Sequence, residues 1–64
     1  MPWNAETLKR LRERRGLTQE ELAQRVGVHR VTIARMEVNA LRPGIDLVEA
    51  LAKALKVKVT DLLK

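Results

Sequence analysis

The sequence predicts an all-α protein of five short helices. Glycine, proline and asparagine divide the 64 residues at short intervals, and the segments between them are rich in Leu, Ala, Glu, Arg and Lys. Within each segment apolar residues recur three and four positions apart, which is the period of one buried helix face. We therefore expect helices at about residues 5–15, 18–26, 29–38, 45–56 and 59–63, in a single domain spanning residues 1–64.

The second expected helix has the clearest start, after a first helix whose buried face carries Leu8 and Leu11. Thr18 is followed three residues later by Glu21, which predicts a capping box. The Thr18 hydroxyl accepts the amide of Glu21, and the Glu21 carboxylate accepts the amide of Thr18. Leu17 and Leu22 flank this box as a hydrophobic staple, and the buried face continues with Ala23 and Val26.

The third helix repeats the staple with Val28 and Ile33 on either side of His29. Histidine is a weak N-cap, so we expect contacts other than local capping to hold this start in place. Ile33 and Met36 mark the face that points toward the core.

The last two helices complete the predicted core. The fourth presents Ile45, Val48, Leu51, Ala52 and Leu55 at helical spacing, and the end of the chain adds Val57, Val59, Leu62 and Leu63.

Composition argues against an enzyme and favours binding. The chain has no Cys, Ser or Tyr and one His, so the usual nucleophile–base pairs, thiolate sites and multi-histidine metal sites cannot form within it. We expect no metal and no cofactor. A net charge of +5 and a pI near 10.5 indicate an anionic partner, either nucleic acid or a membrane surface. No stretch is apolar enough to span a bilayer or to serve as a signal peptide, which makes a cytoplasmic location the default expectation.

The short connection Val26-Gly27-Val28-His29 predicts a sharp corner between the second and third helices. Gly27 is free to adopt the positive φ that a helix C-terminus often needs. Two short helices joined by a tight glycine turn are typical of a helix-turn-helix, although a generic helical corner accounts for Gly27 equally well.

The outward face of the third helix suits a DNA groove. Arg30, Val31, Ala34 and Arg35 point away from the core, with Thr32 at the edge, and this face is nearly free of acidic residues. Arginine can bind guanine through two hydrogen bonds, and small apolar side chains can contact a thymine methyl. The alternative is that both arginines only keep the surface soluble. Gln19, in the first turn of the second helix, is either a phosphate ligand or an ordinary neighbour of the capping box.

Motifs along almost the whole chain resemble one family. They are Leu17-Thr18-Gln19-Glu20-Glu21-Leu22-Ala23, Val26-Gly27-Val28, Thr32-Ile33-Ala34-Arg35-Met36-Glu37, Pro43, Leu51-Ala52-Lys53-Ala54-Leu55, Val57 and Asp61-Leu62-Leu63. Together they closely resemble the Cro/C1-type helix-turn-helix family, also called XRE or phage-repressor-like, over about residues 6–63. The resemblance implies a lambda-repressor-like fold with the helix-turn-helix at about residues 18–38 and the recognition helix at about 29–38, in the major groove.

The same resemblance implies roles for individual residues. It assigns Arg30, Val31 and Arg35 to base contacts, and it assigns Thr18, Gln19, His29, Thr32, Asn39 and Arg42 to the DNA backbone, with His29 and Thr32 able to make mixed contacts. Arg12 and Glu37 resemble the family's internal ion pair, which ties the first helix to the end of the third. Asn39 stands where the family commonly has glycine, and because asparagine tolerates the left-handed conformation we expect the turn to be kept. Lys56 stands at another position where glycine is common, and His29 and Lys58 stand where the family prefers small hydroxyl caps. We expect these changes to weaken local helix ends, the last helix most of all.

These observations predict that the protein is a sequence-specific regulator of transcription. We expect it to bind double-stranded DNA as a homodimer on a palindromic operator. Val57, Val59 and Leu63 exceed what a small core needs, so the C-terminal end is the expected dimer contact. The alternative is an antitoxin, or another regulator whose main partner is a protein such as a toxin. A membrane binder ranks third, because Glu20 and Glu21 lie beside the expected contact face.

Overall fold

The computed structural model describes residues 3–63, and in this part of the chain it contains five helices and no strand. They are α1 (Ala5–Arg14), α2 (Gln19–Val26), α3 (Arg30–Glu37), α4 (Ile45–Leu55) and α5 (Val59–Leu62). The all-α prediction is confirmed, and the predicted helix ends lie within one residue of those observed.

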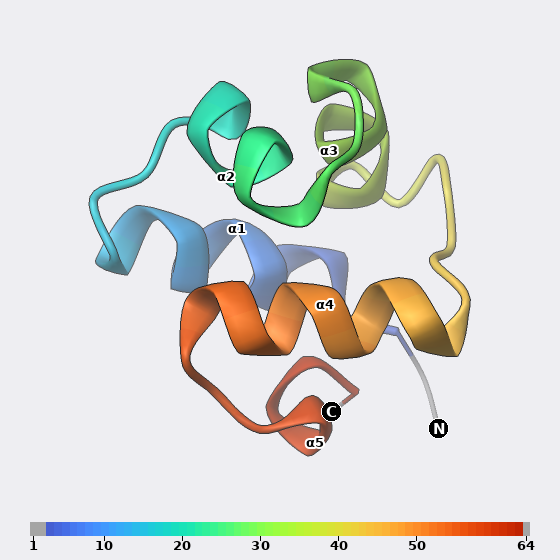
Figure 1. Cartoon of the computed structure of the whole chain (residues 1–64). Coiled ribbons are helices and arrows are strands. Elements are labelled where there is room, and N and C mark those ends of the chain that lie inside the picture. The colour runs from blue at the N-terminus through green and yellow to red at the C-terminus, as the bar shows by residue number, and fades with distance from the viewer. Residues whose placement is uncertain (1–2, 64) are drawn as a thin grey trace.

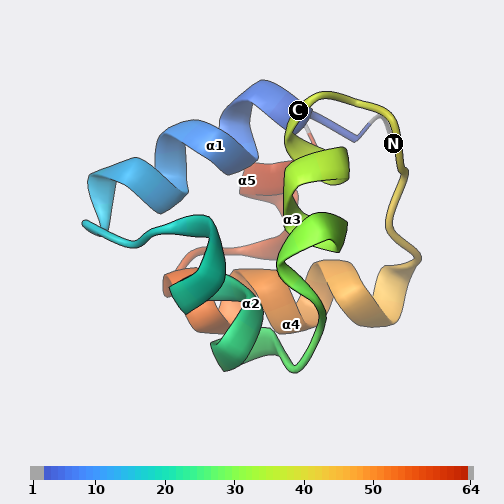
Figure 2. The same cartoon turned by 90° about the horizontal axis from the view of Figure 1, so that it is seen from above.

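The two helices of the helix-turn-helix, α2 and α3, lie together at one end of the molecule (Figure 1). In that view α2 and α3 lie at the top, α5 lies at the bottom, and α1 and α4 lie between them. Seen from above, α2 and α3 are joined by a short turn and lie in front of α4 and α5, with α1 to one side (Figure 2). Helix α3 packs against α1 and α2, and α2 also packs against α4.

All five helices contribute to one hydrophobic core. Its buried side chains are Leu8, Leu17, Leu22, Ala23, Ile33, Met36, Val48, Leu51, Ala52, Leu55 and Leu62. The remaining predicted core residues Leu11, Val26, Val28, Val57, Val59 and Leu63 are half-buried and pack against this cluster. The prediction of Ile45 as a core residue is wrong, because its side chain is 60% exposed. Helical spacing gives the direction of a side chain but not its depth, and Ile45 opens α4 beyond the edge of the core.

The helix ends follow from local hydrogen bonding. Asn4 caps α1 by accepting the amide of Thr7 at 3.0 Å. Gly27 ends α2 with φ 84°, as the sequence predicts for a tight corner. Asn39 takes φ 60° after α3, which confirms that asparagine can replace glycine there.

His29 departs from expectation at the start of α3. Its Nδ1 atom accepts the amide of Val31 at 3.1 Å, so this start does have a local side-chain cap. Nδ1 is bonded to Cγ, as is the capping oxygen of asparagine, so an imidazole with an unprotonated Nδ1 reaches the same donor.

The last helix keeps half of a capping box. The Asp61 carboxylate accepts the backbone amide of Lys58 at 3.0 Å, while the ammonium group of Lys58 has no lone pair with which to accept a bond in return. Helix α5 therefore forms despite the weak cap that the sequence predicts, and Leu62 anchors it because this side chain is fully buried.

Candidate nucleic-acid interface

Helix α2 begins with a complete capping box. The Thr18 hydroxyl accepts the amide of Glu21 at 3.0 Å, and the Glu21 carboxylate accepts the amide of Thr18 at 2.8 Å. The pKa of Glu21 is lowered below the ordinary value for glutamate. The main cause is the hydrogen bond with the Thr18 amide, and the second is the interaction with the Thr18 side chain. The first turn of α2 is therefore held rigidly, with the partial positive charge of its free amides facing outward.

The outer face of α3 is open to solvent. His29, Arg30, Val31 and Arg35 are exposed, and Thr32 is half-buried between this face and the core. The branched apolar side chain of Val31 is 39% exposed on this face. The helix thus presents two guanidinium groups and an apolar contact on one side, while Ile33 and Met36 on the other side are buried.

One acidic residue lies closer to this face than the sequence suggests. Glu20 Oε2 is 3.9 Å from Arg30 Nε, and both side chains are more than half exposed. An exposed ion pair at this distance contributes little to stability, so Arg30 can leave Glu20 for another anion at small cost.

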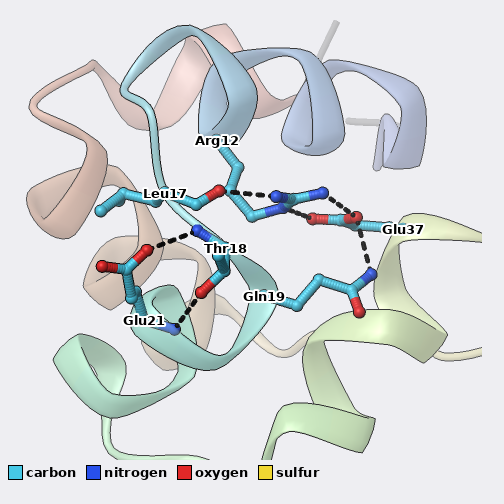
Figure 3. A network of polar contacts seen from close by, with 6 residues as sticks. All are labelled: Arg12, Leu17, Thr18, Gln19, Glu21 and Glu37. Atoms are coloured by element: carbon cyan, nitrogen blue, oxygen red, sulfur yellow. Dashed lines mark hydrogen bonds and ion pairs between the residues drawn. The ribbon is translucent and has the colours of Figure 1, made fainter.

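Behind this face, Arg12 and Glu37 form a buried ion pair (Figure 3). Arg12 Nε donates to Glu37 Oε2 at 2.6 Å and Arg12 Nη2 donates to Glu37 Oε1 at 3.1 Å, which is a bidentate contact. The third nitrogen, Arg12 Nη1, donates to the carbonyl oxygen of Leu17 at 2.6 Å. The hydrogen bond with Glu37 raises the pKa of Arg12, which keeps the guanidinium charged.

Gln19 joins the same group. Its Nε2 atom donates to Glu37 Oε1 at 3.1 Å, so a single carboxylate oxygen accepts from both Arg12 and Gln19. The residue is half-buried. The ion pair therefore links α1, the turn before α2, the first residue of α2 and the last residue of α3.

The loop after α3 carries the other two predicted backbone contacts. Asn39 and Arg42 are both exposed there. The loop turns around the carbonyl oxygen of Arg35, which accepts the amides of Ala40 at 2.8 Å and Leu41 at 3.2 Å. These bonds place the loop directly beside the end of the outer α3 face.

Comparison with known proteins gives the family. Residues 8–62 match the helix-turn-helix family HTH_3, which includes the Cro/C1 or XRE type. The chain belongs to this family. It is a DNA-binding transcriptional regulator of the helix-turn-helix type, and the family is not enzymatic.

Individual relatives agree with this assignment. An uncharacterized HTH-type transcriptional regulator of Archaeoglobus fulgidus is 38% identical over 55 residues, which cover 86% of this chain and 78% of that protein. The P22 c2 repressor, solved in complex with a synthetic operator, has a TM-score of 0.89 at 32% identity, covering 94% of this chain and 91% of that one. The restriction-modification controller protein C.AhdI from Aeromonas hydrophila also gives 0.89, at 29% identity and 92% and 89% coverage. The lambda-repressor-like fold is thereby confirmed.

Two residues that make contacts across the fold carry no strong signal in the sequence. Trp3 donates its indole N–H to the carbonyl oxygen of Met36 at 3.3 Å, close to the end of α3. Arg15 donates from Nε to the carbonyl oxygen of Leu55 at 2.9 Å and from Nη2 to that of Lys56 at 3.4 Å. Trp3 stands out only as the single aromatic residue, and Arg15 has no oppositely charged residue four positions away to indicate a role.

The exposed apolar side chains of this protein are not those at the C-terminal end that the sequence predicts. Val57, Val59 and Leu63 are half-buried and pack against the core, so they belong in part to it, and the C-terminal dimer contact stays a prediction. Among residues 3–63 the exposed large apolar side chains are Val31, Val38, Leu41 and Ile45, and the last three fall in the segment 38–45. Over the same residues, no helix has the length and hydropathy that a membrane span requires.

Proposed function

We propose that the protein binds palindromic DNA operators as a homodimer, with α3 of each copy in the major groove. The observation that carries the proposal is the exposed α3 face, with Arg30, Val31 and Arg35 directed away from the core. The two arginines are suited to guanine edges and Val31 to a thymine methyl, so these three residues read the sequence.

The backbone contacts surround this face. The exposed residues Thr18, His29, Asn39 and Arg42 and the half-buried residues Gln19 and Thr32 lie at the starts of α2 and α3 and in the loop after α3. Hydroxyl, amide and guanidinium donors at these positions, together with the amides of the first turn of α2, are suited to phosphate oxygens. These residues position the protein on the duplex without selecting a sequence.

Size supports a dimer. The described part of the chain measures 26 × 23 × 19 Å, whereas neighbouring half-sites on one face of DNA are about 34 Å apart. One copy therefore reaches one half-site, which offers few base contacts for choosing a site in a genome. The segment 38–45, which follows α3 and exposes Val38, Leu41 and Ile45, is a candidate dimer contact in addition to the C-terminal end.

The dimer is tested by selecting bound duplexes from a random pool. We expect two inverted half-sites with centres about 10 base pairs apart. Enrichment of a single short site without symmetry contradicts the dimer while leaving DNA binding intact.

Titration with duplex DNA at two salt concentrations tests the binding itself. Because phosphate neutralisation releases counterions, we expect the logarithm of the association constant to fall linearly with the logarithm of the salt concentration. Absence of binding at low salt would overturn the proposal.

A comparison of two variants separates base reading from phosphate binding. Arg35→Ala removes a base contact, so we expect about 1–3 kcal/mol of lost affinity for the selected operator and a smaller loss for unrelated DNA. Gln19→Ala removes a phosphate contact and should weaken both duplexes equally. Equal losses for Arg35→Ala on both duplexes, measured by fluorescence anisotropy, would show that Arg35 does not read bases.

A protein partner, such as a toxin, is the second candidate. The exposed apolar side chains Val38, Leu41 and Ile45 favour it, because such side chains on a small protein often mark a protein contact. Sedimentation of the purified chain distinguishes the two: a homodimer supports the first proposal, and a monomer that also fails to pair on the operator supports the second.

A further inference from the structure

The carboxylate of Glu37 does more than neutralise Arg12. Its Oε1 atom accepts two hydrogen bonds of 3.1 Å, one from Arg12 Nη2 and one from Gln19 Nε2, and its side chain is only 2% exposed. Figure 3 shows the amide nitrogen of Gln19 turned toward this oxygen and the amide oxygen turned away. Gln19 is therefore the third member of a group that also contains the ion pair.

This contact determines which way the Gln19 amide faces. An ionised carboxylate only accepts hydrogen bonds, so the nitrogen of the amide must face Glu37 and the oxygen cannot. The bond uses one of the two N–H groups of Nε2 and leaves the second for another acceptor. A freely rotating amide, in contrast, can turn its oxygen toward a phosphate and repel it.

The network also holds the backbone around Gln19. Arg12 Nη1 donates to the carbonyl oxygen of Leu17, two residues before Gln19, at 2.6 Å. Since Glu37 is the last residue of α3, the side chains of Glu37 and Arg12 connect the end of α3 to the turn before α2. A phosphate held by Gln19 is thereby kept in a fixed position relative to the bases that α3 reads.

We propose that Glu37 is a positioning residue for DNA binding, which orients the Gln19 amide so that its second N–H meets a phosphate. This inference rests on the proposed role of Gln19 at the DNA backbone. It assigns to the buried ion pair a contribution to affinity that is separate from its contribution to folding.

Two double variants that both lack the ion pair provide the test. Arg12→Met with Glu37→Gln leaves an amide oxygen at position 37 to accept from Gln19, whereas Arg12→Met with Glu37→Met leaves no acceptor. Replacing both charged partners avoids the unpaired buried charge that a single substitution creates. Because both pairs lose the bond from Arg12 to the Leu17 carbonyl, the comparison is between them: we expect the Glu37→Gln pair, which can still accept from Gln19, to bind the selected operator up to about tenfold more tightly than the Glu37→Met pair, as for one hydrogen bond to a charged group.

The Gln19→Ala background is the control, because a purely structural role of Glu37 does not depend on Gln19. There the difference in affinity between the two double variants should disappear. A difference that persists with Gln19→Ala, or equal affinities of the two pairs when Gln19 is present, would overturn the proposal. If the unaltered chain binds no duplex, the proposed function itself fails. If Gln19→Ala alone leaves the affinity unchanged, DNA binding stands, but the phosphate contact of Gln19 and the present inference both fail.

Nuclear magnetic resonance of the unaltered chain gives a second test that does not depend on variants folding. We expect one Nε2 proton of Gln19 to be hydrogen-bonded, with slow exchange, in the free protein, and the other to shift when operator DNA is added. Two solvent-exposed, equally exchanging protons in the free protein would overturn the inference.

Discussion

At the scale of single residues, Lys56 ends α4 in a conformation that suits glycine better than lysine. Its φ is 58° and its ψ is 45°, within the left-handed region. An L-residue with a Cβ atom adopts this region at a cost of roughly 1–2 kcal/mol, which glycine avoids. The bond from the Arg15 side chain (Nη2) to the carbonyl oxygen of Lys56 uses only the backbone of Lys56, so it does not need the lysine side chain.

We therefore expect Lys56→Gly to raise the free energy of unfolding by about 0.5–1 kcal/mol, after allowance for the greater entropy of glycine in the unfolded chain. Lys53→Gly is the matched control, because it removes the same charge from the helical part of α4 and should cost about 1 kcal/mol. Urea denaturation measures both. Destabilisation by Lys56→Gly equal to that of the control would show that the left-handed conformation carries no strain.

At the scale of one element, the start of α2 depends on an ionised carboxylate. The amide and side chain of Thr18 lower the pKa of Glu21, so in the folded protein Glu21 ionises more readily than in the unfolded chain. A group of this kind stabilises the fold above its unfolded pKa, and the stabilisation is lost as the pH falls through the lowered folded pKa.

Glu21→Gln tests this dependence, because glutamine can accept the Thr18 amide but does not titrate. Near neutral pH the unaltered chain should be the more stable of the two. As the pH falls below about 4.3, the ordinary value for glutamate, we expect its advantage to shrink and then vanish. Chemical denaturation at a series of pH values measures the difference, and an advantage that does not change with pH would contradict the capping role of the charge.

At the scale of the whole molecule, residues before α1 hold together helices that are distant in sequence. The indole of Trp3 donates to Met36 at the end of α3, and the amide of Asn4 donates to the carbonyl oxygen of Leu62 in α5 at 3.1 Å. Trp3 is half-buried against the core to which all five helices contribute. These contacts make Trp3 and Asn4 part of the cooperative unit.

We therefore expect the fluorescence of Trp3, the one tryptophan, to report unfolding of the whole protein, with the same midpoint as the helical signal in far-ultraviolet circular dichroism. Trp3→Phe keeps an aromatic ring and removes the N–H donor, so it should cost about 1 kcal/mol. A fluorescence transition at lower denaturant concentration than the helical transition would show that the N-terminal segment detaches first.

The sequence by itself determined the parts of this protein that depend on neighbours within four residues. The helix positions, the capping box of Thr18 and Glu21, and the turn at Gly27 follow from local hydrogen bonds and backbone preferences, and all three agree with the structure. The sequence also predicted the family and the contact between Arg12 and Glu37. Both came from the resemblance, because motifs that match a family along most of the chain imply that family's packing of helices as well as the helices themselves.

Only the tertiary structure decided how deep each residue lies and what it touches across the fold. Spacing predicts equal burial for Ile45 and Leu55, yet one is largely exposed and the other is fully buried, because packing of neighbouring helices sets depth. The bonds of Gln19 to Glu37 and of Arg15 to the end of α4 join residues far apart in the chain. Such contacts arise when helices pack in three dimensions, and no local pattern of residue types encodes them.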